Sequence, residues 1–226
     1  VQGKAAAIYV PVRFPPDPSL GPLVAARRAG HIRIGYYSAD FRQHAVSSLV
    51  SELLEVHDRQ RFEVVAFSFG PQGNDAMRRR IEAACDRFID VAAMSDRDVA
   101  SLSRELGIDI AIDLGGLTAD SRTGIFAFRA APVQATYLGY GGTLGVDYFD
   151  YLIADGIVIP KGEEEHYREK IVRLPCYQVN DSRRPIAART FTRQEMGLPA
   201  AGFVFCSFNN QYKITPDTFD GWMRML

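Results

Sequence analysis

Short apolar runs alternate with amphipathic stretches from residue 31 to residue 175. Apolar runs of about four to eight residues are typical of buried strands, and apolar residues about three or four apart are typical of helices packed on a sheet. The pattern predicts strands at 31–38, 62–69, 88–91, 108–114, 133–139, 151–154 and 170–174. It predicts helices between them, at 46–54, 74–85, 95–106 and 122–128. This alternation predicts parallel βαβ units, and therefore an α/β fold with a doubly wound, Rossmann-like sheet.

The segment before this pattern is rich in proline. Residues 1–30 contain prolines at positions 11, 15, 16, 18 and 22. Proline lacks a backbone donor and disfavours helix in the residue before it. We therefore expect 1–30 to be an extended linker, followed by a first domain at 31–175.

The segment after the pattern predicts the beginning of a second domain. Residues 176–199 have the composition of a connector, and 203–208 predicts a new strand. Thr215, Pro216 and Asp217 then supply the cap, first-turn proline and first-turn acid of a helix that runs to the end. One strand and one helix cannot form a core, so 200–226 is predicted to be the truncated start of another Rossmann-like domain.

The composition of the chain excludes several classes of binding partner. The net charge is -1, so no global field attracts nucleic acid or an anionic membrane. The three cysteines are far apart and match no metal-site spacing, which is typical of reduced thiols in a reducing compartment. The first residues do not resemble a signal peptide, and no apolar run is long enough to cross a bilayer. We expect a cytoplasmic protein without a metal site, membrane association or nucleic-acid partner.

Two candidate binding segments follow strands of the first domain. Segment 38–44 opens a helix whose free backbone N–H groups favour phosphate, and His44 there can donate to or accept from a ligand hydroxyl. Its alternative interpretation is a simple helix cap. Segment 138–145 is rich in glycine, which lets the backbone approach a ligand closely, but it matches neither the dinucleotide fingerprint nor the P-loop. Its alternative interpretation is a flexible turn.

A third candidate lies in the predicted second domain. Lys213 comes just before the helix capped by Thr215, which suits a diphosphate held by a point charge beside oriented amides. The alternative is an ordinary surface lysine.

Other candidates are weaker. Asp109 and Asp113 fall on one face of a strand and resemble a carboxylate pair, although such residues more often mark strand ends. The pattern favours a surface position for His57 and His166, and a solvated helix face for the arginine run 78–80. Two aromatic residues at helical spacing are expected to pack against a part of the second domain that the chain does not contain; they are Phe219 and Trp222.

At these segments the sequence resembles the protein O-linked N-acetylglucosamine transferases and their SPINDLY-type relatives. Several motifs occur in the family's order and spacing. They are RIGY (33–36), SADF (38–41) with His44, GIDI (107–110), FAFRAAPVQ (126–134), LGY (138–140), DY (150–151), CSFNN (206–210) and YKI (212–214).

The resemblance implies a glycosyltransferase B architecture, in which two nucleotide-fold domains face each other across a cleft. It implies inverting, metal-independent transfer of N-acetylglucosamine from UDP-N-acetylglucosamine to Ser or Thr of proteins, with no cofactor. The partners it implies are a nucleotide-sugar donor and a protein or peptide acceptor. By this resemblance His44 and Lys213 are the catalytic residues. The residues that bind the donor or its sugar are Leu138, Gly139, Tyr140 and Asn210.

The chain departs from the family at several positions. Gly141 replaces the usual proline, which implies a looser loop, and Ala45 follows the histidine where many members have proline. Asn210 stands where animal members have glutamine, so the identity of the preferred nucleotide-sugar donor stays open. The family's phosphate-gripping His-Thr-Thr stretch and helical repeats are absent from the sequence. Two alternatives therefore remain: a SPINDLY-type fucosyltransferase that uses GDP-fucose, and a non-catalytic binding module. The chain by itself is expected to be inactive.

Overall fold

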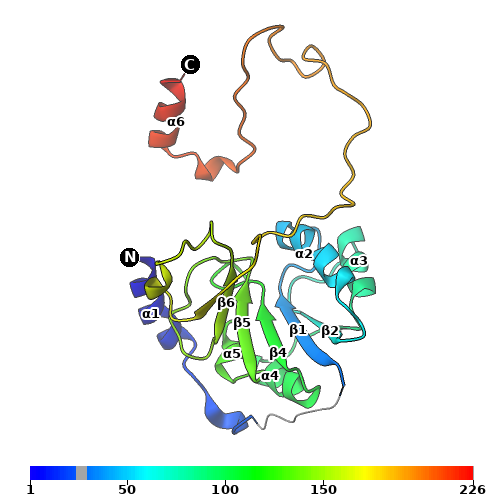
Figure 1. Ribbon diagram of the computed structural model, residues 1–226, viewed down its shortest axis with the longest axis vertical. Helices are drawn as coiled ribbons and strands as arrows, with labels where there is room; N and C mark the ends of the chain where they lie inside the picture. The colour runs from blue at the N-terminus through cyan, green and yellow to red at the C-terminus, as the bar shows by residue number, and fades with distance from the viewer. Residues whose placement is uncertain (24–29, 226) are drawn as a thin grey trace. The chain divides into compact units, whose positions relative to one another are not determined.

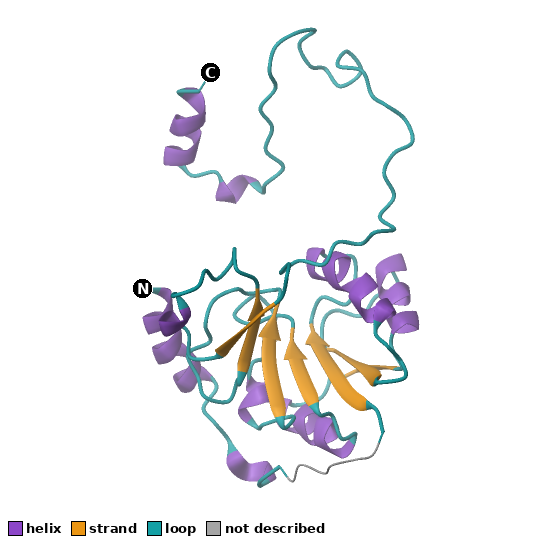
Figure 2. Ribbon diagram, viewed as in Figure 1, coloured by secondary structure: helices purple, strands orange, loops and turns teal. Residues whose placement is uncertain are grey.

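The computed structural model describes residues 1–23 and 30–225, so part of the predicted linker, 24–29, lies outside the described residues. The chain divides into two compact units, Val1–Arg183 and Arg184–Leu226. The first contains a parallel sheet flanked by helices, and the described residues of the second form short helical elements and loops (Figures 1 and 2).

The sheet of the first unit has seven parallel strands in the order β3-β2-β1-β4-β5-β6-β7. The chain starts in the middle, winds outward to β3, and returns past β1 to continue through β4 on the other side. The predicted α/β fold with a doubly wound sheet is confirmed. The strands are β1 (Ile32–Ser38), β2 (Phe62–Ser68), β3 (Arg87–Asp90), β4 (Ile110–Asp113), β5 (Val133–Tyr137), β6 (Tyr151–Ala154) and β7 (Lys170–Arg173).

Helices cover both faces of the sheet because successive strand residues point to opposite sides. Tyr36 of β1 belongs to a buried cluster on the face covered by two helices, α2 (Ala45–Val56) and α3 (Ala76–Ala84). Tyr37 belongs to the cluster on the other face. That face packs against α1 (Gln2–Arg13), α4 (Asp96–Glu105) and α5 (Gly124–Ala127). Two 3₁₀ turns, η1 (Pro18–Leu20) and η2 (Glu164–His166), complete the unit.

The prediction of an extended N-terminal linker was wrong for α1. Ala6 and Val10, four residues apart, are 3% and 0% exposed and pack into the first unit. Pro11 lies near the end of the helix, where it removes only one intrahelical hydrogen bond. The Tyr148 hydroxyl also holds the following turn by donating to the Phe14 carbonyl, at 3.1 Å. Burial of one face outweighs the cost of a single proline, a balance that local proline content does not reveal.

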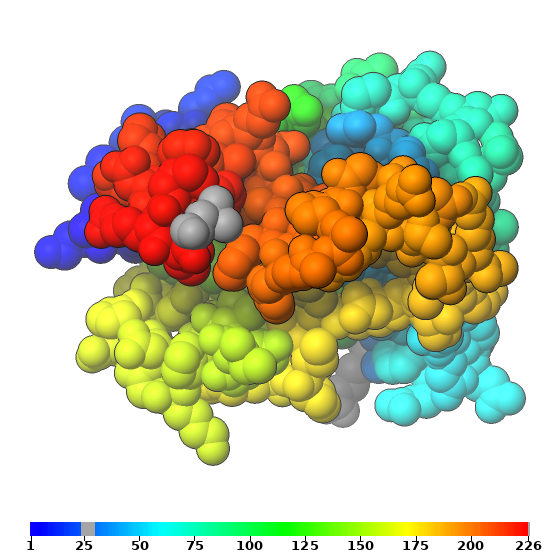
Figure 3. Space-filling model, turned by 90° about the horizontal axis from the view of Figure 1, so that it is seen from above, coloured from blue at the N-terminus to red at the C-terminus, as the bar shows by residue number. Residues whose placement is uncertain are grey.

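The second unit confirms one prediction and contradicts another. Helix α6 (Pro216–Met223) begins as predicted, with the Thr215 hydroxyl accepting from the Thr218 N–H at 3.3 Å. The predicted strand at 203–208 is not formed, and Phe203 and Phe208 are 83% and 97% exposed. This unit is coloured orange to red in Figure 3. A strand needs a neighbour to pair its backbone N–H and C=O groups, and the described residues of this unit offer none.

Candidate functional site

The loops that follow β1, β4 and β5 lie at one edge of the sheet. The three strands are adjacent and parallel, with β4 between the other two. Their carboxyl ends therefore point the same way, and segments 38–44 and 138–145 emerge at the same edge, as the sequence predicted. Phe41 and Leu138 belong to the same buried cluster as Leu114, which follows β4. His44 and the glycine-rich loop thus share one rim of the sheet.

Segment 38–44 is held firmly by short-range hydrogen bonds. The backbone N–H of Asp40 donates to the Ser38 hydroxyl at 2.9 Å, and the Ser47 hydroxyl donates to the Asp40 carbonyl. Phe41 is 1% exposed and anchors the turn in the core. Asp40 therefore projects its side chain from a fixed backbone at the edge of the sheet.

His44 is the N-cap residue of α2. Its Nδ1 lies 3.3 Å from the backbone nitrogen of Val46 and 3.3 Å from Oδ2 of Asp40. The other carboxylate oxygen of Asp40 contacts the Arg42 guanidinium at 3.2 Å. The His44 side chain is 38% exposed. It therefore stands at the amino end of a helix dipole, within reach of a ligand at this edge.

The turn after β5 brings two loops into close contact. Leu138 has a left-handed backbone, with φ of 73°. A Cβ on Gly139 would lie 2.1 Å from the Leu114 carbonyl oxygen, so only glycine fits there. The Tyr177 hydroxyl donates to the Leu138 carbonyl at 2.8 Å and holds the turn. Tyr140 lies over Gly116 of the neighbouring loop.

The far end of the glycine-rich loop is anchored by a buried carboxylate. Glu169, which is 3% exposed, accepts from the Thr143 hydroxyl at 2.6 Å and from the Leu144 N–H at 2.7 Å. Gln2 of α1 donates to the Tyr140 hydroxyl and to the Thr143 carbonyl. The loop that lacks the family's proline is thus fixed at both ends. Sequence reasoning missed Gln2 and Glu169, because their role depends on tertiary contacts.

The two aspartates of β4 and its flanks do not form a pair. Asp109, before the strand, accepts from the Arg33 N–H at 2.8 Å. Asp113, at the other end, is 1% exposed and accepts from the N–H groups of Gly115 and Gly116 at 2.9 and 3.0 Å. Burial raises the pKa of Asp113 to about 6, although the two backbone donors oppose the shift. An aspartate followed by two glycines is a signal for such a turn.

Two other residues, His57 and Arg78, differ from the predictions in their surroundings. His57 is half-buried rather than on the surface, and its Nε2 lies 2.8 Å from the Tyr36 hydroxyl. Burial, with a smaller contribution from Arg59, lowers the pKa of His57. The arginine run is not simply a solvated face, because Arg78 is 7% exposed and pairs with Glu82 at 3.0 Å. Both deviations reflect sheet and helix packing that the local sequence does not show.

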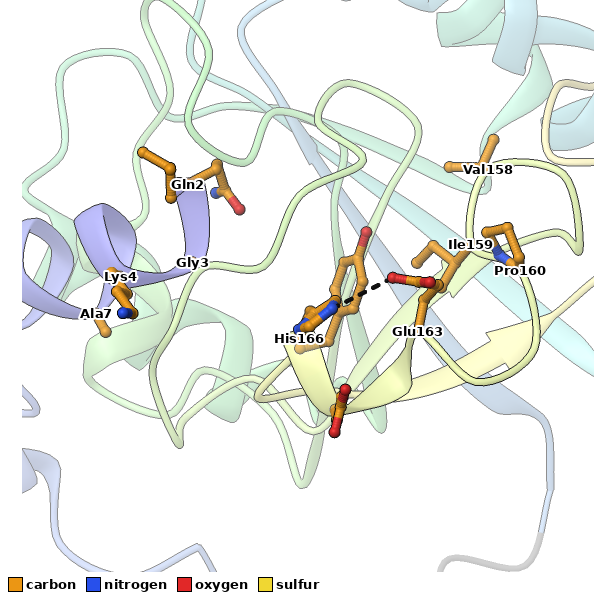
Figure 4. Close-up of a pocket in the computed structure, with 12 residues that line it drawn as sticks. Gln2, Gly3, Lys4, Ala7, Val158, Ile159, Pro160, Glu163 and His166 are labelled. Atoms are coloured by element: carbon orange, nitrogen blue, oxygen red, sulfur yellow. Dashed lines mark ion pairs between the residues drawn. The ribbon is translucent and has the colours of Figure 1, made fainter.

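A cavity of about 770 Å³ is lined by Gln2, which also bonds the Thr143 carbonyl of the glycine-rich loop. One wall is the first turns of α1, with Gln2, Gly3 and Ala7, and the other is formed by residues 158–167. Figure 4 shows His166 turned toward Glu163 on this second wall, and their ion pair measures 3.3 Å. The prediction of a surface position holds for His166, whose side chain is 65% exposed. Sequence analysis missed this cavity because it predicted no helix at α1.

The remaining predicted site residues belong to the second unit. Asn210 precedes the 3₁₀ turn η3 (Gln211–Lys213), and Asn210 and Lys213 are both exposed. Within residues 1–23 and 30–225, no three His, Cys, Asp or Glu side chains group closely enough to hold a metal ion. The described helices include none with the length and apolar character needed to cross a membrane.

Comparison with known proteins places these features in one family. Residues 22–189 match Glycosyl transferase family 41. A protein of Arabidopsis thaliana named probable UDP-N-acetylglucosamine--peptide N-acetylglucosaminyltransferase SEC is 36% identical over 223 residues, which cover 94% of this chain and 23% of that protein. Its SPINDLY counterpart in the same plant is 35% identical over 205 residues, covering 86% and 21%. The chain thus spans about a fifth of the length of these relatives.

A solved structure supports the same conclusion. The O-GlcNAc transferase of Thermobaculum terrenum, determined as a mutant, superposes with a TM-score of 0.70 at 35% identity, over 78% of this chain and 34% of that one. The parallel sheet thus matches the glycosyltransferase B fold of that protein. The family match extends over most of the chain and includes both loops at the edge of the sheet. The chain belongs to glycosyl transferase family 41.

Proposed function

We propose that this chain is part of a protein O-glycosyltransferase that transfers N-acetylglucosamine from UDP-N-acetylglucosamine to Ser or Thr hydroxyls. The observation that carries the proposal is the position of His44. Its imidazole stands at the start of α2, at the same sheet edge as the Leu138–Tyr140 turn. The names of the related plant proteins favour the same donor and a peptide acceptor.

The reaction proposed here is an inverting displacement without a metal. The acceptor hydroxyl attacks the anomeric carbon, the new C–O bond forms as the bond to the diphosphate breaks, and the hydroxyl proton passes to a base or to solvent. His44 positions the acceptor or accepts this proton. Leu138, Gly139 and Tyr140 line the sugar site.

The leaving diphosphate gains negative charge as the bond breaks. We assign its stabilisation to Lys213, which precedes the amino end of α6, and we assign Asn210 to the donor site. Both residues lie in the short second unit, whose predicted domain is represented here by one 3₁₀ turn and one helix. The 226-residue chain should therefore show little transfer, because much of the donor site is missing. Robust turnover by the purified chain, verified by intact mass, would contradict this assignment.

The test uses the full-length protein with UDP-N-acetylglucosamine and GDP-fucose as separate donors and a Ser/Thr peptide library as acceptor. Transfer from the first donor with inversion, undiminished by a chelator, supports the proposal. Transfer from GDP-fucose alone would identify a fucosyltransferase, and tight donor binding without transfer would identify a binding module.

Two variants test the residue assignments. Lys213→Ala should lower kcat more than it weakens donor binding, because the charge it neutralises grows during transfer. His44→Ala should slow transfer while calorimetry shows nearly unchanged nucleotide affinity. Wild-type rates in His44→Ala would remove this histidine from the active site.

A further inference from the structure

We infer that Asp40 is a positioning residue that selects the tautomer of His44 and leaves its Nε2 as a proton acceptor. This inference rests on the proposed function, in which His44 faces the acceptor. Asp40 itself touches no reacting atom in this scheme. It acts through the imidazole, as the aspartate of a Ser-His-Asp triad does.

The two neighbours of Nδ1 demand opposite protonation states. The Val46 N–H, at 3.3 Å, is a donor and requires an unprotonated Nδ1, which would place the proton of the neutral ring on Nε2. The Asp40 carboxylate, also at 3.3 Å, is an acceptor and requires a protonated Nδ1. Only one of these hydrogen bonds can form at a time.

The negative charge of Asp40 favours its hydrogen bond with Nδ1 over the one from the Val46 N–H. A hydrogen bond from an imidazole N–H to a carboxylate is charge-assisted and roughly twice as strong as a neutral one. Val46 is also in the first helical turn, where water can satisfy an N–H group. The Asp40 contact therefore prevails, and the proton of the neutral ring resides on Nδ1. Among the described residues Nε2 has no hydrogen-bond partner, so it remains available to an acceptor hydroxyl.

Asp40 is prepared for this role by its surroundings. Its backbone is fixed on both sides by Ser38 and Ser47, and its side chain is 15% exposed. Arg42 contacts the carboxylate oxygen that His44 does not use. The Nε of Arg42 is buried and has no hydrogen-bond partner among the described residues. The Asp40 carboxylate, which the other end of this guanidinium contacts, is therefore the counter-ion of Arg42.

A further charged group near this loop lies at the start of α3. Asp75, the N-cap of that helix, interacts with the backbone N–H of Gln43 and with that of Arg78. The Asp75 side chain thus holds the 38–44 loop by accepting from the backbone of that loop. Among the described residues, three charged groups lie near the imidazole: Asp40 contacts it directly, Arg42 pairs with Asp40, and Asp75 bonds the backbone of Gln43.

The first experiment needs no catalysis. Long-range ¹H–¹⁵N correlation spectra of the 226-residue chain, recorded well above the ordinary histidine pKa of about 6.5, distinguish the two neutral tautomers. Wild-type His44 should carry its proton on Nδ1, and Asp40→Asn should shift the population toward Nε2–H, since an amide can donate to Nδ1. His57, bonded to Tyr36, reports whether the variant is folded. Asp58→Asn, which alters an exposed aspartate near the other end of α2, is the matched control and should leave the His44 signals unchanged.

The second experiment uses the full-length protein. Asp40→Asn should lower kcat roughly 10–100-fold with donor KM nearly unchanged, less than the loss of about 10⁴-fold found in buried triads, because His44 is partly exposed. Asp58→Asn should transfer at the wild-type rate.

The outcomes separate this inference from the proposed function. Predominant Nε2–H in the wild-type chain would overturn the inference whatever the kinetics, and this measurement does not depend on any variant folding. The expected tautomer with full activity in Asp40→Asn but slow transfer in His44→Ala would overturn the positioning role alone. Full activity in His44→Ala would instead overturn the placement of His44 in the active site, and the role of Asp40 with it.

Discussion

Segments β2 and 203–208 have similar sequences and different structures. The first, FEVVAFS, lies between β1 and β3, and its residues Val64–Phe67 are at most 1% exposed. The second, FVFCSF, forms no strand, and its three phenylalanines are more than half exposed. Apolar composition is thus not sufficient for a strand. The backbone must also find neighbours that pair its N–H and C=O groups, and a layer that covers the side chains.

Amide hydrogen exchange should show this difference most strongly. Strand β2 is paired with β1 along its whole length and with β3 over its last four residues. Its amides should exchange only through extensive unfolding, whereas those of 203–208 should exchange almost as in a free peptide. We expect rates at least about 10³-fold apart in the 226-residue chain. Comparable protection in the two segments would show that 203–208 has found a strand partner in solution. Dilution of the sample would then reveal whether that partner is a second copy.

Buried and exposed aromatic residues provide the next test. Tyr177 is 8% exposed, stacks edge-on with Tyr137, and bonds the Leu138 carbonyl. Tyr177→Ala should lower the free energy of unfolding of the first unit by about 3–4 kcal/mol. Phe205→Ala removes a side chain that is 58% exposed and should change it by no more than about 0.5 kcal/mol.

Urea titration followed by circular dichroism measures both variants. Fluorescence is unsuitable, since the single tryptophan, Trp222, lies in the second unit. Equal losses in the two variants would mean that the second unit also contributes to the measured transition.

The sequence was informative where local pattern and topology agree. The strands of the first unit are apolar runs, the first five of them separated by helices, and parallel connections then bring 38–44 and 138–145 to one edge. The pattern failed where a distant contact decides the result. Helix α1 depends on burial of Ala6 and Val10, and 203–208 lacks partners.

The same limit applies to the site. The position of His44 follows from the strand that precedes it, but its contact with Asp40 depends on side-chain rotamers within a turn. The contact of Gln2 with Tyr140 joins residues that the sequence separates by most of a domain. Spacing alone gives no signal for either contact.

The two units also differ in the space around their glycine residues. A Cβ at residue 139 would overlap the Leu114 carbonyl oxygen at 2.1 Å, so Gly139→Ala must displace one of the two loops. We expect a loss of about 2–3 kcal/mol in the unfolding free energy of the first unit. Gly221 of α6 has open space around its Cβ position, and Gly221→Ala should leave that transition unchanged.

A crystal structure of Gly139→Ala would show where the strain is relieved. Movement of the 138–145 loop is the expected result, and full-length protein with this change should then lose transfer activity. Wild-type stability in Gly139→Ala would mean that the two loops are not in the contact described here.

The smallest expected effect concerns a buried charge, a feature of the first unit. Burial raises the pKa of Asp113 from its ordinary value of 3.8 to about 6. Because the folded-state value is the higher one, the resulting stabilisation is fully present below pH 3.8 and is lost as the pH rises through about 6. Asp113→Asn cannot titrate, so the stability of wild type relative to this variant should increase by about 2 kcal/mol between roughly pH 7.5 and 4.5. Urea titrations of both proteins at several pH values measure this difference. If the stabilities of the two proteins changed in parallel with pH, burial would not raise the pKa of Asp113 in the folded state.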